Sequence, residues 1–428
     1  MVSMSLMPRT ESHRRPTLGV QLVVMALLAG CTGDRGAEPT GAMVQDSSGV
    51  AIVMNSGPGS WGPSGAWGLR KTLRIDPDES DADRLFEQIV GIDASRDGRF
   101  VVVDGGASRV HTFGPEGEAI ASFGRVGSGP GEFPAMTLML SSRRVVVDSL
   151  ERINIPGVDG RLSVFSWTGD LVDLKTPEPG LTSVMGWVRS EAGLVLKEVL
   201  AMTLSADGSP PAFAQTIFRR DGDGAVRRVV DLPARRPPEA TSAGVARMEA
   251  FGPIPVWTVQ SESYVAVALP QEYSIKVCDL EGNLVRVIRR DVPGEAVTAR
   301  DREAFLNSHR EILERGGSPE SLIKQMEQGI SFPDRWPVLG QLLGGPDETL
   351  WVQRIDRNLA VERANWGEAF MGGLPGLEWD VFDWEGQFLG SVRMPEGFRP
   401  FQFRGEDLYG VGEDTFGVQS IVRLALER

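Results

Sequence analysis

The stretch FGRVGSGPGEF, Phe123 to Phe133, closes a unit of about forty residues that contains four short runs of strand-forming residues. The runs lie within residues 89–123, and turn signals rich in Gly, Pro and Asp separate them. Four short antiparallel strands joined by tight turns have the size of one blade of a β-propeller. We therefore expect this stretch to carry the chain from one blade to the next.

The glycines of this stretch allow two interpretations. They can supply the positive φ angles of a tight crossing between blades, or they can point backbone N–H groups at a bound phosphate. No Lys-Ser or Lys-Thr follows, no helix begins here, and a glutamate adds negative charge, which disfavours a nucleotide loop. The sequence favours a structural inter-blade loop formed by Arg125, Gly127, Gly129, Pro130, Gly131 and Glu132.

The same strand and turn pattern recurs along the chain. Its clearest marks are the turn phrases FGPEGEAI, FSWTGDLV, CDLEGNLV and FDWEGQFL, each with a glycine before a polar-apolar strand. The pattern predicts an all-β fold, a six-bladed β-propeller with a small helical insertion. The expected blades are residues 84–124, 134–176, 181–233, 254–290, 337–394 and a last unit that begins near residue 400.

The last unit holds only three strands before the chain ends. The run Gly49 to Met54 (GVAIVM) reads as a separate strand, and Trp67 to Ile75 reads as a further strand pair. A strand from the opposite terminus can complete the last blade and remove an open edge. We therefore expect the N-terminal strand at 49–54 to close the propeller.

Three segments of the first unit carry a family resemblance: FVVVD at Phe100 to Asp104, SRVHTFGPEGEAIASFG at Ser108 to Gly124, and GRVGSGPGEF at Gly124 to Phe133. The chain resembles bacterial six-bladed β-propeller lipoproteins related to NHL-repeat proteins. The third unit and the segment 291–336 depart from the repeat. The resemblance implies a fold and does not imply an activity.

The segment 291–336 has helical periodicity. Thr298 can cap a first helix with Asp301 three residues on, and Ser318-Pro319 can begin a second. This helical insertion has two interpretations, a hairpin packed on the rim of the propeller or a lid over its central channel.

The N-terminus predicts export and a lipid anchor. A basic start precedes a twelve-residue apolar run, which ends in Leu28-Ala29-Gly30-Cys31. This resembles a bacterial lipobox, so residues 1–31 form a lipoprotein signal and Cys31 receives the lipid. Residues 32–48 read as a flexible tether, and 49–428 as the propeller. Thr32, which is not Asp, favours the outer membrane over the inner by resemblance to a known sorting rule.

The net charge disfavours one class of partner, and the cysteine content disfavours disulfides and cysteine metal sites. The formal net charge of −14 disfavours a nucleic-acid partner, which binds basic patches. Once Cys31 is lipidated, Cys278 stands alone and reads as a buried apolar residue, so we expect no disulfide and no cysteine metal site.

The sequence offers few catalytic groups. His111 lies within an expected strand and His309 within an expected helix, and no GxSxG motif is present, which disfavours a nucleophilic triad. A calcium-type metal on the propeller axis remains an alternative, because hard oxygen ligands bind such ions. Its candidate ligands are Glu87, Asp93, Asn154, Glu198 and Glu378. Asp104 and Asp148 end similar strands and read as structural acceptors of turn N–H groups.

Five of the ten tryptophans lie in residues 336–384, and one of them, Trp366, lies in an expected long loop, RANWGEAFMGGLPGL. It is the candidate for an exposed ligand-binding aromatic. The leading hypothesis is a lipid-anchored envelope propeller that binds or scaffolds a protein or carbohydrate, without cofactor or metal. The alternative is a metal-dependent hydrolase or lyase with its site on the axis.

Overall fold

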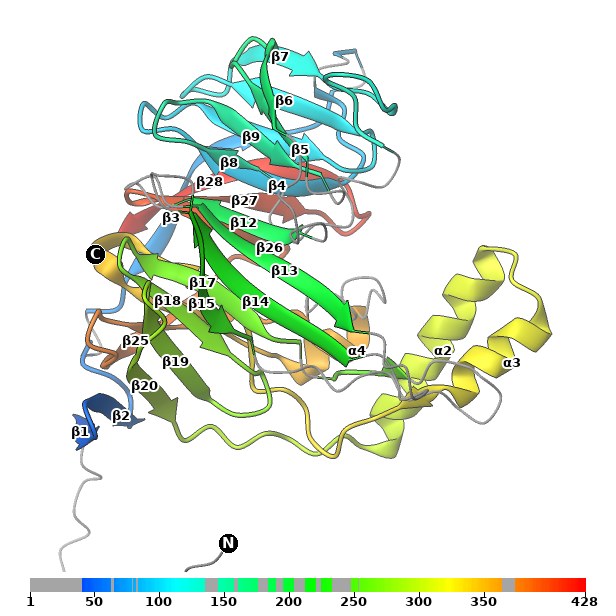
Figure 1. Ribbon diagram of the computed structural model, residues 1–428. Helices are drawn as coiled ribbons and strands as arrows, with labels where there is room; N and C mark the ends of the chain where they lie inside the picture. Colours follow the sequence, from blue (N-terminus) through cyan, green and yellow to red (C-terminus); the bar gives the residue numbers. More distant parts are fainter. Residues whose placement is uncertain are drawn as a thin grey trace, which may run out of the picture. The chain divides into compact units, whose positions relative to one another are not determined.

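Six sheets of four or more strands make up most of the part of the chain that the structure describes (Figure 1). The structure, a computed structural model, describes residues 41–62, 65–78, 80–81, 84–134, 145–157, 161–175, 184–189, 195–203, 212–220, 225–232, 248–252, 254–363 and 374–428, all within one compact unit. We number the sheets as blades 1 to 6 in chain order. In each blade the four strands follow one another in space as a meander.

Blades 1 to 3 lie in the first half of the chain. Their strands are β4 (Ile89–Ala94), β5 (Phe100–Asp104), β6 (Arg109–Phe113) and β7 (Ala119–Phe123) in blade 1, then β8 (Val146–Val147), β9 (Ile153–Pro156), β10 (Leu162–Phe165) and β11 (Leu171–Lys175) in blade 2, and then β12 (Val184–Arg189), β13 (Val195–Thr203), β14 (Ala212–Arg220) and β15 (Val226–Asp231) in blade 3.

Blades 4 to 6 follow, with the helices between them. Blade 4 has β17 (Val256–Ser261), β18 (Tyr264–Ala268), β19 (Ser274–Asp279) and β20 (Leu284–Arg290), extended by β2 (Val50–Ser56) and β1 (Gly41–Ser47). Blade 5 has β22 (Leu339–Gly344), β23 (Leu350–Arg354), β24 (Glu378–Phe382) and β25 (Phe388–Arg393), and blade 6 has β26 (Phe398–Arg404), β27 (Asp407–Glu413), β28 (Gln419–Glu427) and β3 (Gly68–Ile75). The remaining elements are α2 (Ala299–Arg315), α3 (Glu320–Gln328), α4 (Arg357–Arg363), the 3-10 turn η2 (Pro346–Glu348) and the paired short strands β16 (Met248–Glu249) and β21 (Ile330–Ser331).

The blades contact one another in a closed cycle. The first strand of blade 1, β4, contacts β8, and β8 contacts β12. Blades 3 and 4 meet through β15 and β19, and β17, β22 and β26 then lead from blade 4 to blade 6. The cycle closes because β26 also contacts β4. This arrangement confirms the predicted β-propeller, and the six sheets fit the predicted six blades.

A strand from the N-terminal region closes the propeller, as predicted, but the strand is β3. It pairs with β28 in antiparallel register, from Ile75 opposite Ile421 to Gly68 opposite Glu427. The prediction that residues 49–54 fill this place is wrong, and so is the strand pair at 67–75. No turn residue follows Gly68 in the run GLRKTLRI, so it continues as one strand and turns Leu69, Leu73 and Ile75 toward buried clusters.

The N-terminal hairpin β1–β2 extends blade 4. Strand β2 pairs in parallel with β20, and β1 pairs with β2 across the Ser48-Gly49 turn. Buried Asn55 fixes the hairpin, because its Nδ2 donates to the carbonyl oxygens of Arg289 (3.3 Å) and Gly386 (3.0 Å), while its Oδ1 accepts from the N–H of Phe388 (2.8 Å). The prediction of a flexible tether over 32–48 is therefore wrong for residues 41–47, which form a strand.

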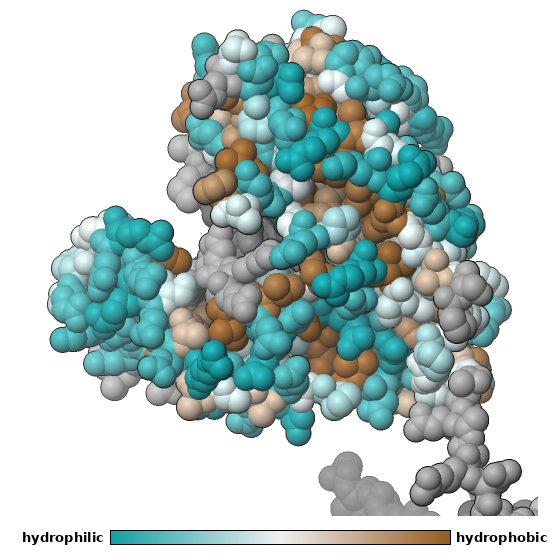
Figure 2. Space-filling view, turned by 180° about the vertical axis from the view of Figure 1, so that it is seen from behind, coloured by the Kyte–Doolittle hydropathy of each residue, from teal (hydrophilic) through white to brown (hydrophobic). Residues whose placement is uncertain are grey.

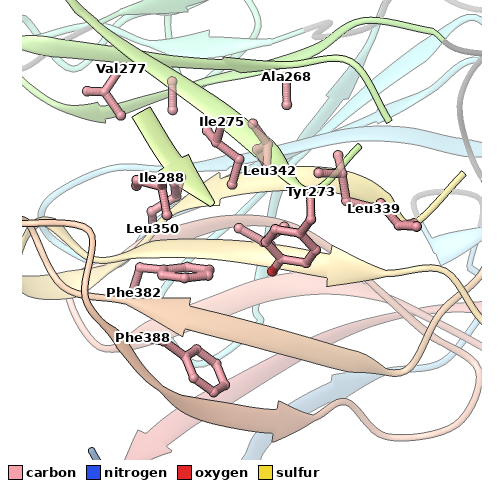
Figure 3. Packing of buried hydrophobic residues seen from close by; sticks show 13 residues of the cluster. Ala268, Tyr273, Ile275, Val277, Ile288, Leu339, Leu342, Leu350, Phe382 and Phe388 are labelled. Carbon is pink, nitrogen blue, oxygen red and sulfur yellow. The ribbon is translucent and has the colours of Figure 1, made fainter. Parts of the chain in front are cut away.

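Apolar side chains fill the spaces between neighbouring blades. Between blades 4 and 5, Ile275 and Ile288 face Leu342 and Phe382, all of them buried (Figure 3). Cys278 is buried and free, as predicted, and burial raises the pKa of its thiol.

The glycine of the repeated turn phrase has the same backbone conformation in four blades. Gly117, Gly169, Gly282 and Gly386 have φ between 84° and 91°, the left-handed region that favours glycine. Each also touches the outer strand of the preceding blade. A Cβ on Gly282 would lie 2.4 Å from the carbonyl oxygen of Val229 in β15. The turn glycines therefore set how closely consecutive blades approach.

The outer strand of each blade joins the third strand through a β-bulge. The register shifts lie at residues 112/113, 164/165, 217/218, 277/278, 381/382 and 423/424. A bulge bends the strand and increases its twist. In blade 4 the fourth strand, β20, still pairs with a further strand, β2.

The turn glycines allow a matched test of blade packing. We expect Gly282→Ala to lower the free energy of unfolding by about 3 kcal/mol, because it adds a clash with Val229 to an unfavourable positive φ. Gly417→Ala is the control, since Gly417 has φ 81° and open space around it, and should cost only about 1 kcal/mol. Urea unfolding of both variants gives the two values, and equal costs would contradict a packing role for Gly282.

Candidate functional site

The long connections of the propeller emerge on one face. In antiparallel blades, connections after the first and third strands lie at one end and those after the second and fourth at the other. Connections of the first kind span two to five residues. The second kind includes the long segments 124–145, 232–255, 291–338 and 355–377. We call the face with these segments the long-loop face, and binding residues concentrate in such loops.

The helical insertion belongs to this face and begins as predicted. The Thr298 hydroxyl accepts from the N–H of Asp301, and Asp301 Oδ2 accepts from the N–H of Thr298 (2.8 Å), which forms a capping box at the start of α2. Helices α2 and α3 form an antiparallel hairpin that extends away from the sheets (Figure 1). Seen from behind, the projecting lobe is largely hydrophilic (Figure 2).

Asp301 also fastens the insertion to the loop between β23 and β24. Its carboxylate accepts from Arg357 Nη2 (3.0 Å) and Nε (3.2 Å) in α4, and from the indole Nε1 of Trp336 (3.1 Å). Although burial opposes ionisation, these hydrogen bonds and the Arg357 charge lower the pKa of Asp301 to about 2. The carboxylate is therefore charged at neutral pH and joins three segments of the long-loop face.

An aromatic cluster lies at the base of the hairpin. The ring centroids of Phe251 and Trp336 are 4.0 Å apart, and Phe305 of α2 packs 4.7 Å from Phe251. Ala360 of α4 is buried in the same cluster. The base of the insertion, the segment 248–252 and α4 thus share one small core.

A cleft of about 450 Å³ opens at the end of blade 4 where the insertion begins. It lies between the loop before β19, the end of β20 and strand β2. Its lining residues are Met54, Glu272, Tyr273, Ser274, Arg289, Arg290 and Asp291. We call this the blade-4 cleft.

A fully buried carboxylate holds the inner wall of the blade-4 cleft. Asp380 of β24 accepts from the hydroxyl groups of Tyr273 (2.7 Å) and Ser391 (2.7 Å) and forms an ion pair with Arg290. The Arg290 guanidinium also lies 3.8 Å from the ring centroid of Phe388. Burial and the Asp380 charge raise the pKa of Tyr273 well above its ordinary value, so this phenol stays protonated and donates. Blades 4 and 5 are thereby locked together.

The rim of the blade-4 cleft carries charged side chains that have no partner among the described residues. Among the residues that the structure describes, the side chains of Glu272, Arg289 and Asp291 make no hydrogen bond or ion pair. One cation and two carboxylates therefore surround a rigid floor. Such a rim can bind a polar ligand that offers groups of both signs.

The predicted inter-blade loop lies between β7 and β8, on the long-loop face. Glu132 accepts from the N–H of Gly129 (2.9 Å) and pairs with Arg125, which lowers the pKa of its carboxyl. The Phe133 N–H donates to the Arg125 carbonyl oxygen (2.9 Å), and Gly131 has φ 78°. The polar groups of this loop therefore bond to one another. The assignment of the loop as a structural crossing between blades stays a prediction.

Asp104 and Asp148 serve as the predicted acceptors of turn N–H groups. Asp104 accepts from the N–H groups of Glu87, Gln88, Gly106 and Ala107. Asp148 accepts from the N–H groups of Leu150 and Arg152 and from the Arg152 side chain. Both carboxylates are therefore structural.

The residues predicted as possible ligands of a metal on the propeller axis lie in several different blades. Glu87 and Asp93 belong to blade 1, Asn154 to blade 2 and Glu378 to blade 5; the side chain of Glu198 lies outside the described residues. Glu378 is paired with Arg393 (2.8 Å). Within the described residues, no three His, Cys, Asp or Glu side chains group as metal ligands do.

Asp93 instead joins three blades. Its Oδ2 accepts from the N–H of Val147 in blade 2 (2.6 Å), and its Oδ1 accepts from Gln402 of blade 6. Arg404 Nη2 lies 3.8 Å from Oδ1. Burial raises the pKa of Asp93 to about 6, against the opposing effect of Arg404 and the hydrogen bonds.

Two predicted site residues cannot be placed. Cys31 and Trp366 lie outside the residues that the structure describes. His111 is buried in β6 beside Phe86, and His309 is buried in α2. In the described part of the chain, no helix combines the length and hydropathy needed to cross a bilayer.

Sequence reasoning missed the Tyr273–Arg290–Asp380 network. Asp380 lies in the strand sequence EWDVF, between the apolar residues Trp379 and Val381. A charged residue at such a buried position is the one sign in the sequence that it needs a partner. The partner, Arg290, lies ninety residues earlier in another blade, and no local pattern links the two.

Comparisons with known proteins find similarity in fold only. No family model matches the chain, and no curated protein sequence matches it. Among solved structures, virginiamycin B lyase from Staphylococcus aureus is 11% identical with a TM-score of 0.42, over 84% of this chain and 99% of that one. A member of the DUF4221 family from Bacteroides vulgatus is 11% identical (TM-score 0.48, 84% and 98%), and a luciferin-regenerating enzyme 10% (0.42, 84% and 95%). The propeller assignment rests on the sheets themselves.

Asp301 provides a test of the attachment of the insertion. We expect Asp301→Ala to lower the free energy of unfolding by about 3 kcal/mol, because the Trp336 indole loses its acceptor and Arg357 loses its buried carboxylate, keeping only Glu295 and Thr298. Glu303→Ala, an exposed change on the same helix, should have little effect. Urea unfolding with limited proteolysis of 291–336 measures both, and equal stability of the two variants would refute this role.

Asp93 predicts a specific pH dependence. Its pKa is about 6 in the folded protein, against 3.8 for an ordinary aspartate, so folding takes up a proton between these pH values. Relative to Asp93→Asn, the wild type should lose about 3 kcal/mol of stability as pH rises from 3 to 7 and stay level above that. Chemical unfolding of both proteins across this range tests it; a constant difference at every pH would contradict it.

Proposed function

We propose that this chain is a lipid-anchored propeller of the bacterial cell envelope that binds a ligand on its long-loop face. The observation that carries the proposal is the placement of the four long segments 124–145, 232–255, 291–338 and 355–377, together with the blade-4 cleft, on that one face. On the opposite face, the connections after the first and third strands span only two to five residues, which offer little for recognition. The acidic net charge supports a partner other than nucleic acid.

The anchor follows from the N-terminal sequence. The lipobox-like Leu28-Ala29-Gly30-Cys31 supports acylation of Cys31, and Thr32 supports the outer membrane as the destination. The resemblance to propeller lipoproteins related to NHL-repeat proteins supports the same address. We propose a protein or carbohydrate ligand, because the cleft rim offers Arg289, Glu272 and Asp291 as uncommitted polar groups.

Charge reversal in the cleft tests the binding role. The full-length chain, purified from membranes, is presented to a bacterial glycan array and to detergent-solubilised envelope proteins. We expect Arg289→Glu to weaken binding of the retained ligand at least tenfold, since the one uncommitted cation of the rim changes sign. The control is Lys71→Glu, an exposed reversal on β3, which should bind as the wild type does.

Two results would overturn the proposal. Equal binding by the wild type and Arg289→Glu would remove the cleft from recognition. A stoichiometric divalent metal whose removal by EDTA lowers the melting temperature would favour the metal-dependent hydrolase or lyase instead.

The anchor has its own test. We expect Cys31→Ser to move the protein from the membrane fraction to the soluble fraction and to remove the mass of the acyl chains from the intact protein. Wild-type protein without added lipid mass would contradict the anchor and leave the binding experiment unaffected.

A further inference from the structure

Strand β1 leaves one outer edge of the propeller unprotected. It is the outermost strand of the six-stranded blade 4, and within the described residues only β2 pairs with it. Its seven residues, Gly41–Ser47, pair with β2 without a register shift. The other blades end in a strand that follows a bulge, and four of those strands, β3, β11, β15 and β25, carry Arg or Lys.

Proteins normally protect such edges. Bulges, Pro and charged side chains, Lys above all, prevent a further strand from adding. Strand β1, with the sequence GAMVQDS, has no Pro, Lys or Arg and only one charged residue, Asp46. Met43 and Val44 at its centre are 67% and 59% exposed, so nothing else described in the chain covers them.

The hairpin geometry shows which backbone groups face outward. Ser48 and Gly49 have φ of 58° and 86°, as in a two-residue type I′ turn, and Ser47 stands opposite Val50. The pair that flanks such a turn is hydrogen-bonded, and hydrogen-bonded pairs alternate along the hairpin. The N–H and C=O groups of Ala42, Val44 and Asp46 therefore point away from β2, toward the open edge.

The outward N–H and C=O groups of β1 can pair with the same groups of β1 in a second copy of the chain. An antiparallel copy of β1 centred on Val44 would place Val44 opposite Val44 of the second chain, and Ala42 opposite Asp46, in hydrogen-bonded pairs. That register forms up to about six backbone hydrogen bonds. No like charges face each other in it, because Asp46 meets Ala42.

The lipid anchor selects a second copy as the occupant. Cys31 precedes Gly41 by ten residues, which span at most about 35 Å when extended. If Cys31 is acylated, as the proposed function holds, β1 of every copy lies within that distance of one bilayer. A second copy is then the one partner always held at the same height, which raises its effective concentration.

We propose that β1 is an interface between two copies of this chain, which pair antiparallel through β1 and join two blade-4 sheets into one. Asn55 makes the interface rigid, since its three buried hydrogen bonds hold the hairpin against blades 4 and 5.

The test removes one outward N–H. Val44→Pro deletes the central donor of the edge and spares the hydrogen bonds to β2, whereas Val44→Ala keeps the N–H and serves as the control. The full-length chain in detergent is examined by sedimentation. We expect the wild type and Val44→Ala to sediment as dimers, and Val44→Pro to raise the dimer dissociation constant at least tenfold with an unchanged melting temperature.

The outcomes separate this proposal from the anchor. Wild-type protein that lacks lipid mass but still dimerises through Val44 at raised concentration supports the interface and contradicts the anchor. Monomeric wild type, lipidated or not, overturns the interface. Dimers that persist in Val44→Pro also overturn the interface. So does a defined envelope protein that binds the monomeric wild type but does not bind Val44→Pro.

Discussion

The close approach of consecutive blades is the constraint on which the rest of this structure depends. At four of the turns between third and fourth strands, a glycine with positive φ lies against the backbone or side chains of the preceding blade. A side chain there would separate the sheets, and the interleaved apolar layers would lose contact. The bulges in every blade serve the same geometry, because they twist the outer strands around the neighbouring sheet.

Carboxylates do much of the remaining structural work. Asp93 joins three blades, Asp380 joins two, and Asp301 fastens the helical insertion. Each accepts several hydrogen bonds in a buried place, where an unpaired charge would be costly. Some of the acidic residues of this chain are therefore buried and hydrogen-bonded within the fold. The charged side chains at the rim of the blade-4 cleft differ from them, because they have no partner among the described residues.

The local features of the fold were predictable from the sequence, and the long-range ones were not. Turn glycines, the Thr298–Asp301 capping box and the strands of each blade have short patterns, because the interactions that create them lie within a few residues. The closing strand was misassigned since GVAIVM and GLRKTLRI are equally good strands, and only pairing with β28 separates them. The Arg290–Asp380 pair, ninety residues apart, has no local pattern at all.

Closure by β3 has a consequence for how the chain folds. The last blade is built from residues 68–75 and 398–427, so the two ends of the propeller meet in one sheet. The register that joins β3 to β28 can form only after residues 421–427 have been synthesised. Contacts of such large separation along the chain form slowly. A chain that crosses a membrane unfolded would therefore complete its ring only after β28 had been exported, and until then β3 would remain an open edge.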